Sequence, residues 1–128
     1  MDLVVKTKKQ DSTCYVFAEG AINSDTADYF YDTINAELDE MVHVVVLNMS
    51  GVVYMSSMGL SRLAKVKKSI EALEGILMIT QLQPQIQKLL QVVKALPLLN
   101  VFKSTEEADA YLDRIQKGAL KDRGENKK

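Results

Sequence analysis

Two stretches of the chain are hydrophobic at almost every position, and they constrain the fold more than any other feature. The first runs from Val42 to Leu47 and is nearly continuous valine and leucine, and the second runs from Ile76 to Thr80. A strand that is apolar on both faces is typical of a parallel strand buried inside a sheet. Parallel strands are joined by crossovers, usually helices. The two stretches therefore predict an α/β fold.

Segments with hydrophobic residues at helical spacings of three and four separate and follow these strands. A serine or aspartate (Ser24 or Asp25) is expected to cap the first helix, and a double serine opens the second. Pro84 fits the first turn of the third helix, and Pro97 ends that helix. An S-x-x-E capping box, Ser104 to Glu107, begins the fourth. The four helices are expected at about residues 24–39, 56–73, 84–97 and 104–117.

Shorter segments rich in β-forming residues complete the pattern. Residues 3–8 and 13–18 flank the turn residues Gln10-Asp11-Ser12 and predict a hairpin that Gly20 ends. Residues 52–54 and 101–102 read as short extended pieces. We therefore expect a small mixed β-sheet with an antiparallel N-terminal hairpin at its edge, its remaining strands parallel, and about four helices packed on it.

The length of 128 residues indicates one domain, placed at residues 1–117, and the charged, patternless residues 118–128 are expected to form a flexible tail. With 16 basic and 17 acidic residues, the chain lacks the basic excess of a nucleic-acid-binding protein. Cys14 is the only cysteine, which suggests a reducing compartment. No signal peptide and no apolar run of about 20 residues is present. A cytoplasmic protein without membrane insertion is expected.

The segment Ser56-Ser57-Met58-Gly59-Leu60 is the best candidate for a functional site. Two hydroxyl groups lie at a helix start, where backbone N–H groups lack partners and the helix dipole is positive. One hydroxyl is enough to cap the helix. The other is then available as a site where a phosphate is added or held. The residues alone leave open whether Ser57 is the cap or the phosphoacceptor.

Catalytic sites are not supported by the residue types present. The strand–serine–helix order resembles a nucleophile elbow, but Met55 replaces the first glycine of G-x-S-x-G. The only histidine, His43, precedes the serine, whereas the hydrolase order places it after. One histidine and one cysteine make no metal-ligand cluster, and no glycine-rich phosphate loop is present. No catalytic residue, metal or cofactor is expected.

Three segments together resemble the STAS domain, the family of sulfate transporters and anti-sigma factor antagonists, over about residues 3 to 117. Gly20–Ala27 is similar to the family's G-x-L-D-x-x-T-A step into its first helix. Val45–Leu60 is similar to the family's strand and D-S-x-G-L helix start. Leu98–Ala108 is similar to its final strand and S-x-E-E-A helix opening.

The resemblance implies a regulatory role without catalysis. In the antagonist branch, an anti-sigma factor that is also a kinase phosphorylates the serine of D-S-x-G-L, which corresponds to Ser57, with Ser56 as second choice. The family's aspartates at two nearby positions are replaced here by Ser56 and Asn23, and both changes remove negative charge beside the acceptor. The residues expected to bind the kinase are Asn23, Ser24, Ser56, Ser57, Met58, Gly59, Ser61, Arg62 and Lys65.

Alternatives remain for the role of these residues and of the whole chain. Met58 either contacts a partner or folds onto its own domain. The basic residues Arg62, Lys65 and Lys68 either extend a binding face or simply face solvent. The resemblance also allows a STAS subunit that is never phosphorylated, beside the ATPase of a lipid-transport system. The oligomeric state, the identity of the partner and any small-molecule ligand stay open.

Overall fold

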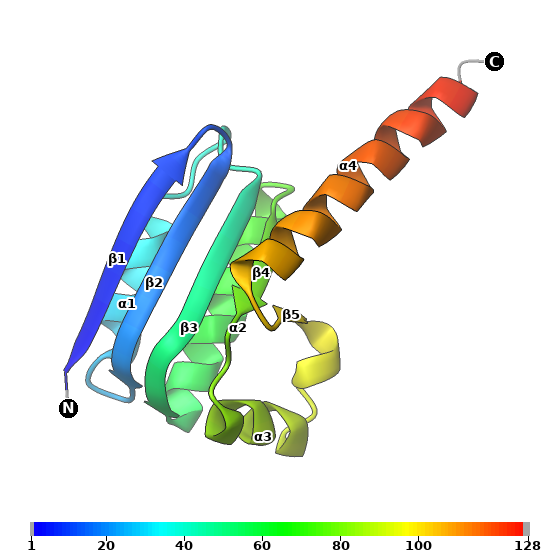
Figure 1. Cartoon of the computed structure of the whole chain (residues 1–128). Coiled ribbons are helices and arrows are strands. Elements are labelled where there is room, and N and C mark those ends of the chain that lie inside the picture. Colours follow the sequence, from blue (N-terminus) through cyan, green and yellow to red (C-terminus); the bar gives the residue numbers. More distant parts are fainter. Residues whose placement is uncertain (1, 127–128) are drawn as a thin grey trace.

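The computed structural model describes the backbone of residues 2–126 and the side chains of residues 2–115. Five strands form one sheet in the spatial order β1-β2-β3-β4-β5 (Figure 1). β1 pairs with β2 antiparallel, and every other neighbouring pair is parallel. The predicted mixed sheet is confirmed. The strands are β1 Leu3–Gln10, β2 Thr13–Ile22, β3 Val44–Met55, β4 Ile76–Thr80 and β5 Asn100–Phe102.

The helices are divided between the two faces of the sheet and its lower edge. α1 (Ala27–Asn35) and α2 (Ser57–Ala72) lie side by side behind the sheet in Figure 1. α3 (Pro84–Val92) lies at the lower edge, and a 3₁₀ turn, η1 (Leu96–Leu98), leads from it to β5. α4 (Thr105–Asn126) starts on the front face beside β4 and β5 and then extends away from the sheet.

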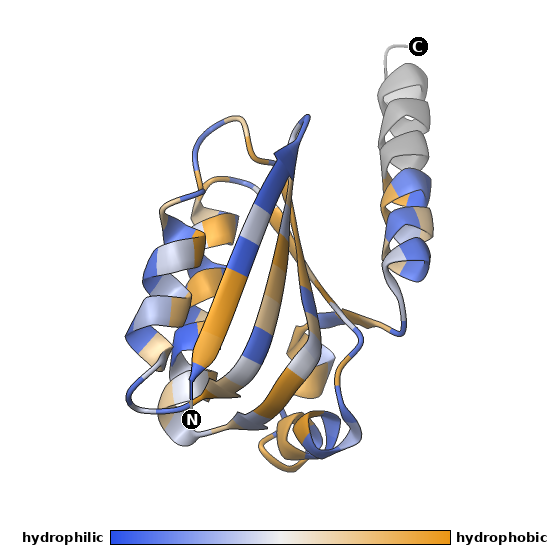
Figure 2. Cartoon of the chain, turned by 60° about the vertical axis from the view of Figure 1, so that its left-hand side comes forward, coloured by the Kyte–Doolittle hydropathy of each residue, from blue (hydrophilic) through white to orange (hydrophobic). Residues whose placement is uncertain are grey.

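Two hydrophobic clusters hold these layers together. The larger lies between the sheet and helices α1 to α3, and its fully buried members include Phe30, Leu47 and Leu63. The smaller lies under the start of α4, where Ala108 packs against β3 and β4. In Figure 2 the strands and the sheet-facing sides of the helices are mostly orange, whereas the upper half of the edge strand β1 is blue. The lysines of β1 account for that polar edge, which discourages pairing with another chain.

Strands β2 and β3 are longer than their sequences predict, because glycine lies inside each of them. Gly20 was expected to end its strand, but β2 passes through it with a register irregularity and a φ of +120°. A Cβ at Gly20 would lie 2.0 Å from the carbonyl oxygen of Asp2. A Cβ at Gly51 would lie 3.0 Å from the Ala18 carbonyl oxygen, a tight contact. The separate pieces expected at residues 42–47 and 52–54 are therefore one strand, and β2 and β3 reach the lower edge of the sheet together.

The first helix is shorter than predicted at both ends. Its N-cap is Thr26 rather than Ser24 or Asp25, which lie exposed in the preceding turn. It ends at Asn35 rather than near Asp39, because the following residues bind β1 instead. Glu37 accepts a hydrogen bond from Thr7 Oγ1 at 3.3 Å and pairs with Lys9 at 3.7 Å.

Two helices end at non-glycine residues in the left-handed conformation. α2 ends at Ala72, close to the expected residue 73, where Glu74 takes a positive φ of 62° and the Gly75 N–H bonds to the Ile70 carbonyl at 2.9 Å. α3 was expected to run to Pro97, but Lys94 has a φ of 59°, and the Ala95 N–H bonds to the Leu90 carbonyl at 2.8 Å. Both ends have the 6→1 hydrogen bond of a Schellman motif. Pro97 lies inside η1.

The start of α4 agrees with its predicted cap. The Glu107 N–H donates to Ser104 Oγ at 3.1 Å. The helix continues to Asn126 and so runs through most of residues 118–128, the segment predicted to be a flexible tail. The side chains of that segment lie outside the described residues, and the domain boundary at residue 117 stays a prediction.

Candidate functional site: the lower edge of β2 and β3

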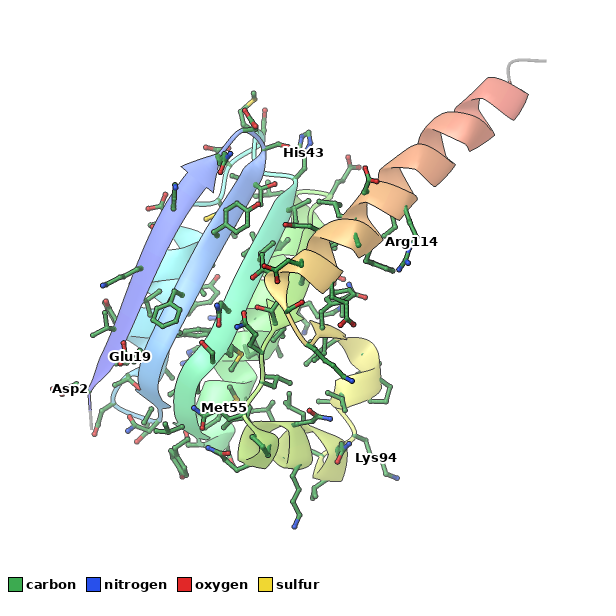
Figure 3. The ribbon with its side chains drawn as sticks, in the orientation of Figure 1. Asp2, Glu19, His43, Met55, Lys94 and Arg114 are labelled. Atoms are coloured by element: carbon green, nitrogen blue, oxygen red, sulfur yellow. The ribbon has the colours of Figure 1, made fainter. Side chains whose placement is uncertain are left out.

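The ends of β2 and β3 bring the Asn23 loop and the double serine together. Ile22 pairs with Met55 in the last register position, and the Ser56 N–H donates to the Ile22 carbonyl at 2.9 Å. Figure 3 labels Met55 at the lower end of the sheet, from which α2 begins. Carboxyl ends of neighbouring parallel strands commonly form binding sites in α/β proteins. Residues 23–26 and 56–59 therefore form one surface.

The first turn of α2 sits directly against the end of β2. A Cβ on Gly59 would lie 2.3 Å from the carbonyl oxygen of Ile22 and 2.9 Å from its Cγ2. No residue other than glycine fits there without displacement of the backbone. Gly59 was predicted as a partner contact, but it is buried. Its lack of a side chain allows α2 to pack closely against the end of β2.

The side chain of Asn23 organises its own loop. Its Oδ1 accepts hydrogen bonds from the backbone N–H of Asp25 at 2.9 Å and of Thr26 at 3.1 Å. Thr26 Oγ1 donates to the Ala21 carbonyl at 2.6 Å and accepts from the Asn23 N–H at 2.9 Å. This is an Asx turn, a motif that asparagine and aspartate both form. The loop conformation therefore survives the absence of the carboxylate found in the family pattern.

The two serines have different roles at the start of α2. Ser56 is the N-cap, and its Oγ accepts a hydrogen bond from the Gly59 N–H at 3.1 Å. Ser57 is the first residue inside the helix and is exposed, and its hydroxyl makes no hydrogen bond to any other residue in the described part of the chain. The first turn of α2 contains no acidic residue. Ser57 is thus not needed as a cap, and its hydroxyl projects from a neutral helix N-terminus.

Three of the predicted contact residues lie further along α2, and two of them are tied to α1. Arg62 Nε pairs with Asp28 Oδ1 at 2.7 Å, and its side chain is partly covered. Lys65 Nζ lies 4.9 Å from the centre of the Tyr31 ring, a cation–π distance. Ser61 is exposed, one turn after Ser57. The serine faces solvent, whereas the two cations help hold α1 against α2.

Exposed hydrophobic side chains precede and follow the double serine in the chain, and two of them were missed in the sequence. Met58 is 41% exposed, so part of its side chain is open to a partner. Val53 and Tyr54, at the end of β3, are 43% and 52% exposed. The sequence gives no signal for them, because their exposure arises where β3 continues beyond its last partner in β4. Tyrosine and methionine are enriched in protein interfaces, so this patch extends the candidate surface.

Glutamine side chains at the start of α3 bind the other side of β3. Gln83 Nε2 donates to the Ser50 carbonyl at 2.7 Å, and Gln85 Nε2 donates to the Val53 carbonyl at 3.0 Å. β4 pairs only with residues 44–48 of β3, so these carbonyls lie where the sheet has no further strand. The glutamines fix the backbone of the exposed patch, and sequence reasoning did not identify them.

The remaining reactive side chains lie far from this surface. His43 is at the opposite, upper end of β3 from Met55 (Figure 3). Cys14 is fully buried in β2, and burial, followed by the negative charge of Glu37, raises the pKa of its thiol. Within residues 2–115, no group of three histidine, cysteine, aspartate or glutamate side chains is placed to hold a metal ion. The helices described include none long and apolar enough to span a membrane.

Comparison with known proteins agrees with the fold. BtrV of Bordetella bronchiseptica, named as a candidate anti-sigma factor antagonist, is 28% identical over 102 residues, 80% of this chain and 88% of that protein. A candidate anti-sigma factor antagonist from Thermotoga maritima has a similar structure, with a TM-score of 0.77, 17% identity, and coverage of 84% of this chain and 92% of that one.

The antagonist SpoIIAA of Bacillus has the same fold in its unphosphorylated form, with a TM-score of 0.65, 16% identity, and coverage of 88% of this chain and 98% of that one. Its phosphorylated form also gives a TM-score of 0.65, at 18% identity, with coverage of 88% and 99%. The family model described as the STAS domain matches residues 4–108, which includes both strand ends and the whole double-serine segment. The chain therefore belongs to the STAS domain family.

Proposed function

We propose that this protein is an anti-sigma factor antagonist, a non-catalytic switch that docks on an anti-sigma factor and is released when that partner, a serine kinase, phosphorylates Ser57. The proposal rests on one observation above all. Ser56 Oγ caps α2, which leaves the neighbouring Ser57 hydroxyl exposed and without a hydrogen-bond partner among the described residues. The resemblance to BtrV and SpoIIAA supports the choice of partner class.

The mechanism follows from charge and solvation. A phosphate adds about −1.5 to −2 charges at neutral pH. At the first helical position it faces unpaired backbone N–H groups and the positive end of the helix dipole, so the fold tolerates it. A partner surface that covers Met58 and Tyr54 would have to bury that charge, which is costly. Phosphorylation therefore lowers affinity without unfolding the antagonist.

The contact surface is proposed to comprise the half-buried Asn23 and the exposed side chains at the lower edge of the sheet. Asn23, Ser24, Ser57, Met58 and Ser61 belong to it, together with Val53 and Tyr54. Arg62 and Lys65 border it through their contacts with α1. The protein would act in the cytoplasm, where ATP and the kinase are present.

Phosphorylation is tested with the purified serine-kinase anti-sigma factor encoded in the same genome. Intact mass after incubation with ATP is expected to show one added phosphoryl group in the wild type and none in Ser57→Ala. Ser61→Ala, which removes another exposed hydroxyl of the contact surface but keeps Ser57, is the comparison and is expected still to gain one phosphoryl group, at the wild-type rate or more slowly. Phosphate on Ser57→Ala would refute the assignment of the acceptor.

A second candidate is a STAS subunit that is never phosphorylated, beside the ATPase of a lipid-transport system. The neutral surroundings of Ser57 favour it, since the first turn of α2 contains no acidic residue and Asn23 replaces a carboxylate. Adjacent transporter genes, together with stable co-purification of the ATPase, would support this candidate. Adjacent genes for a kinase and a sigma factor would support the first.

A further inference from the structure

An apolar groove runs along α2 on the side away from α1. It lies between α2 and η1 and has a volume of about 290 Å³. Aliphatic side chains of both elements line it, among them Leu60, Ala64, Leu98 and Leu99. Leu98 is 72% exposed, so an aliphatic side chain faces solvent beside the groove. These residues define the α2–η1 groove.

Cations mark the solvent side of this groove. Lys67 and Lys68 line it together with Glu71. Lys67 Nζ pairs with Glu71 Oε2 at 2.8 Å, so that charge is balanced within the helix. Lys68 is exposed, and no acidic side chain among the described residues pairs with it. The α2–η1 groove therefore combines an aliphatic floor with one uncompensated positive charge at its rim.

The groove is continuous with the Ser57 surface. Residues 57, 60, 64 and 68 are spaced by three or four along α2 and so follow one side of the helix. At 1.5 Å per residue, Ala64 lies about 10 Å along the axis from Ser57, and Lys68 about 16 Å. A partner element three turns long that covers Ser57 and lies along α2 reaches both the aliphatic floor and Lys68.

We propose that the α2–η1 groove binds an amphipathic helix of the same partner that docks at Ser57. This inference rests on the proposed function. The partner helix would place leucine, isoleucine or phenylalanine side chains at spacings of three and four into the groove, and a carboxylate beside Lys68. The volume is at the lower limit for a site that encloses a small ligand, and it suits a few inserted side chains. Phosphorylation of Ser57 then controls binding at an interface whose apolar contacts lie two turns further along α2.

The test measures the affinity of the purified serine-kinase anti-sigma factor by titration calorimetry without ATP. Ala64→Arg fills the groove from an exposed helical position, and Leu98→Ser removes its most exposed apolar side chain. Each is expected to raise Kd by roughly tenfold or more, as for side chains at the centre of an interface. Met41→Ser is the matched control, because Met41 is 75% exposed and lies two residues from His43, at the opposite end of the sheet from Met55, and it is expected to stay within twofold of the wild type.

A second pair of measurements identifies the chemistry of the occupant. Lys68→Glu is expected to weaken binding more at low salt than at high salt, because it reverses a charge that faces a carboxylate. Sedimentation of the protein alone is expected to give the same mass for the wild type and Ala64→Arg. A wild-type dimer that Ala64→Arg abolishes would show that a second copy fills the groove, and would overturn the proposal.

The outcomes separate this inference from the proposed function. Wild-type binding that survives Ala64→Arg and Leu98→Ser within twofold overturns the groove proposal and leaves the Ser57 switch intact. Absence of wild-type binding, with no phosphate transferred to Ser57, overturns both. Circular dichroism and thermal unfolding of each variant establish that a loss of affinity is not a loss of fold.

Discussion

The backbone of Gly59 lies so close to Ile22 that a Cβ on the glycine would be 2.3 Å from the Ile22 carbonyl oxygen. The same carbonyl accepts the hydrogen bond from the Ser56 N–H. One peptide group at the end of β2 thus positions both the cap and the first turn of α2, and with them the exposed Ser57.

Gly59→Ala is therefore expected to destabilise the protein although alanine is the better helix former. The clash outweighs a helix-propensity gain of about 1 kcal/mol and leaves a net cost of about 1–3 kcal/mol, as for other overpacked sites. Urea unfolding measures it. Ser61→Ala, in the same helix but exposed, is the control and should change stability by less than about 0.5 kcal/mol. A Gly59→Ala variant as stable as the wild type would show that β2 and α2 are not in tight contact.

Replacing each serine of the pair by alanine is expected to have unequal effects on stability. Ser56→Ala removes the side chain that accepts from the Gly59 N–H and should cost about 1 kcal/mol. Ser57→Ala removes a hydroxyl with no partner among the described residues and should cost less than about 0.5 kcal/mol. The free energy of unfolding of both variants in urea is the measurement. The reverse ranking would make Ser57 the cap and leave Ser56 as the free hydroxyl.

Ser57→Asp should separate the stability of the fold from its ability to dock. An acidic residue in the first turn of α2 interacts favourably with the helix dipole, so stability should be unchanged or rise by about 0.3–1 kcal/mol. Affinity for the kinase anti-sigma factor should fall at the same time. Ser57→Asn is the control, because asparagine is similar in size to aspartate but neutral. This variant should bind the kinase anti-sigma factor more tightly than Ser57→Asp does. Equal binding by the two variants would show that charge does not gate the interface.

Local pattern was enough to predict most of the fold. The apolar stretch that became β3 and the double serine that opens α2 both have the predicted type and place, because burial on two faces and capping leave strong signals in neighbouring residues. The Glu107 N–H bond to Ser104 followed from the same kind of rule. The site was recognised because its central residues are consecutive in the chain.

What the sequence did not reveal depends on contacts between distant segments. Position 59 is restricted to glycine by its contact with Ile22. α1 ends early because Glu37, just after the helix, binds Thr7 and Lys9 of β1. Glu74 and Lys94 have a positive φ, but a glutamate or a lysine in the sequence does not indicate this conformation. The exposure of Tyr54 arises because β4 is too short to cover the end of β3. None of these is visible in a window of neighbouring residues.

The buried thiol of Cys14 makes stability depend on pH in the alkaline range. Burial, and then the charge of Glu37, raise the pKa of the folded-state thiol above its ordinary 9.0, an effect that Lys9 opposes only in part. Below about pH 8 the thiol is protonated in both states and contributes no pH dependence. As the pH rises past about 9, the unfolded chain releases a proton that the folded chain keeps, so the free energy of unfolding falls.

Cys14→Ala should therefore lose less stability than the wild type between pH 7 and about pH 10, although it starts lower because a buried side chain is truncated. Urea unfolding at both pH values gives the comparison. The pKa of Tyr15 is also raised by burial, but Tyr15 is present in both proteins, so its contribution cancels in the difference. The folded wild type should in addition react with a thiol reagent such as DTNB much more slowly than the urea-unfolded chain. Equal losses of stability in the two proteins, or rapid labelling of the folded one, would mean that Cys14 is open to solvent.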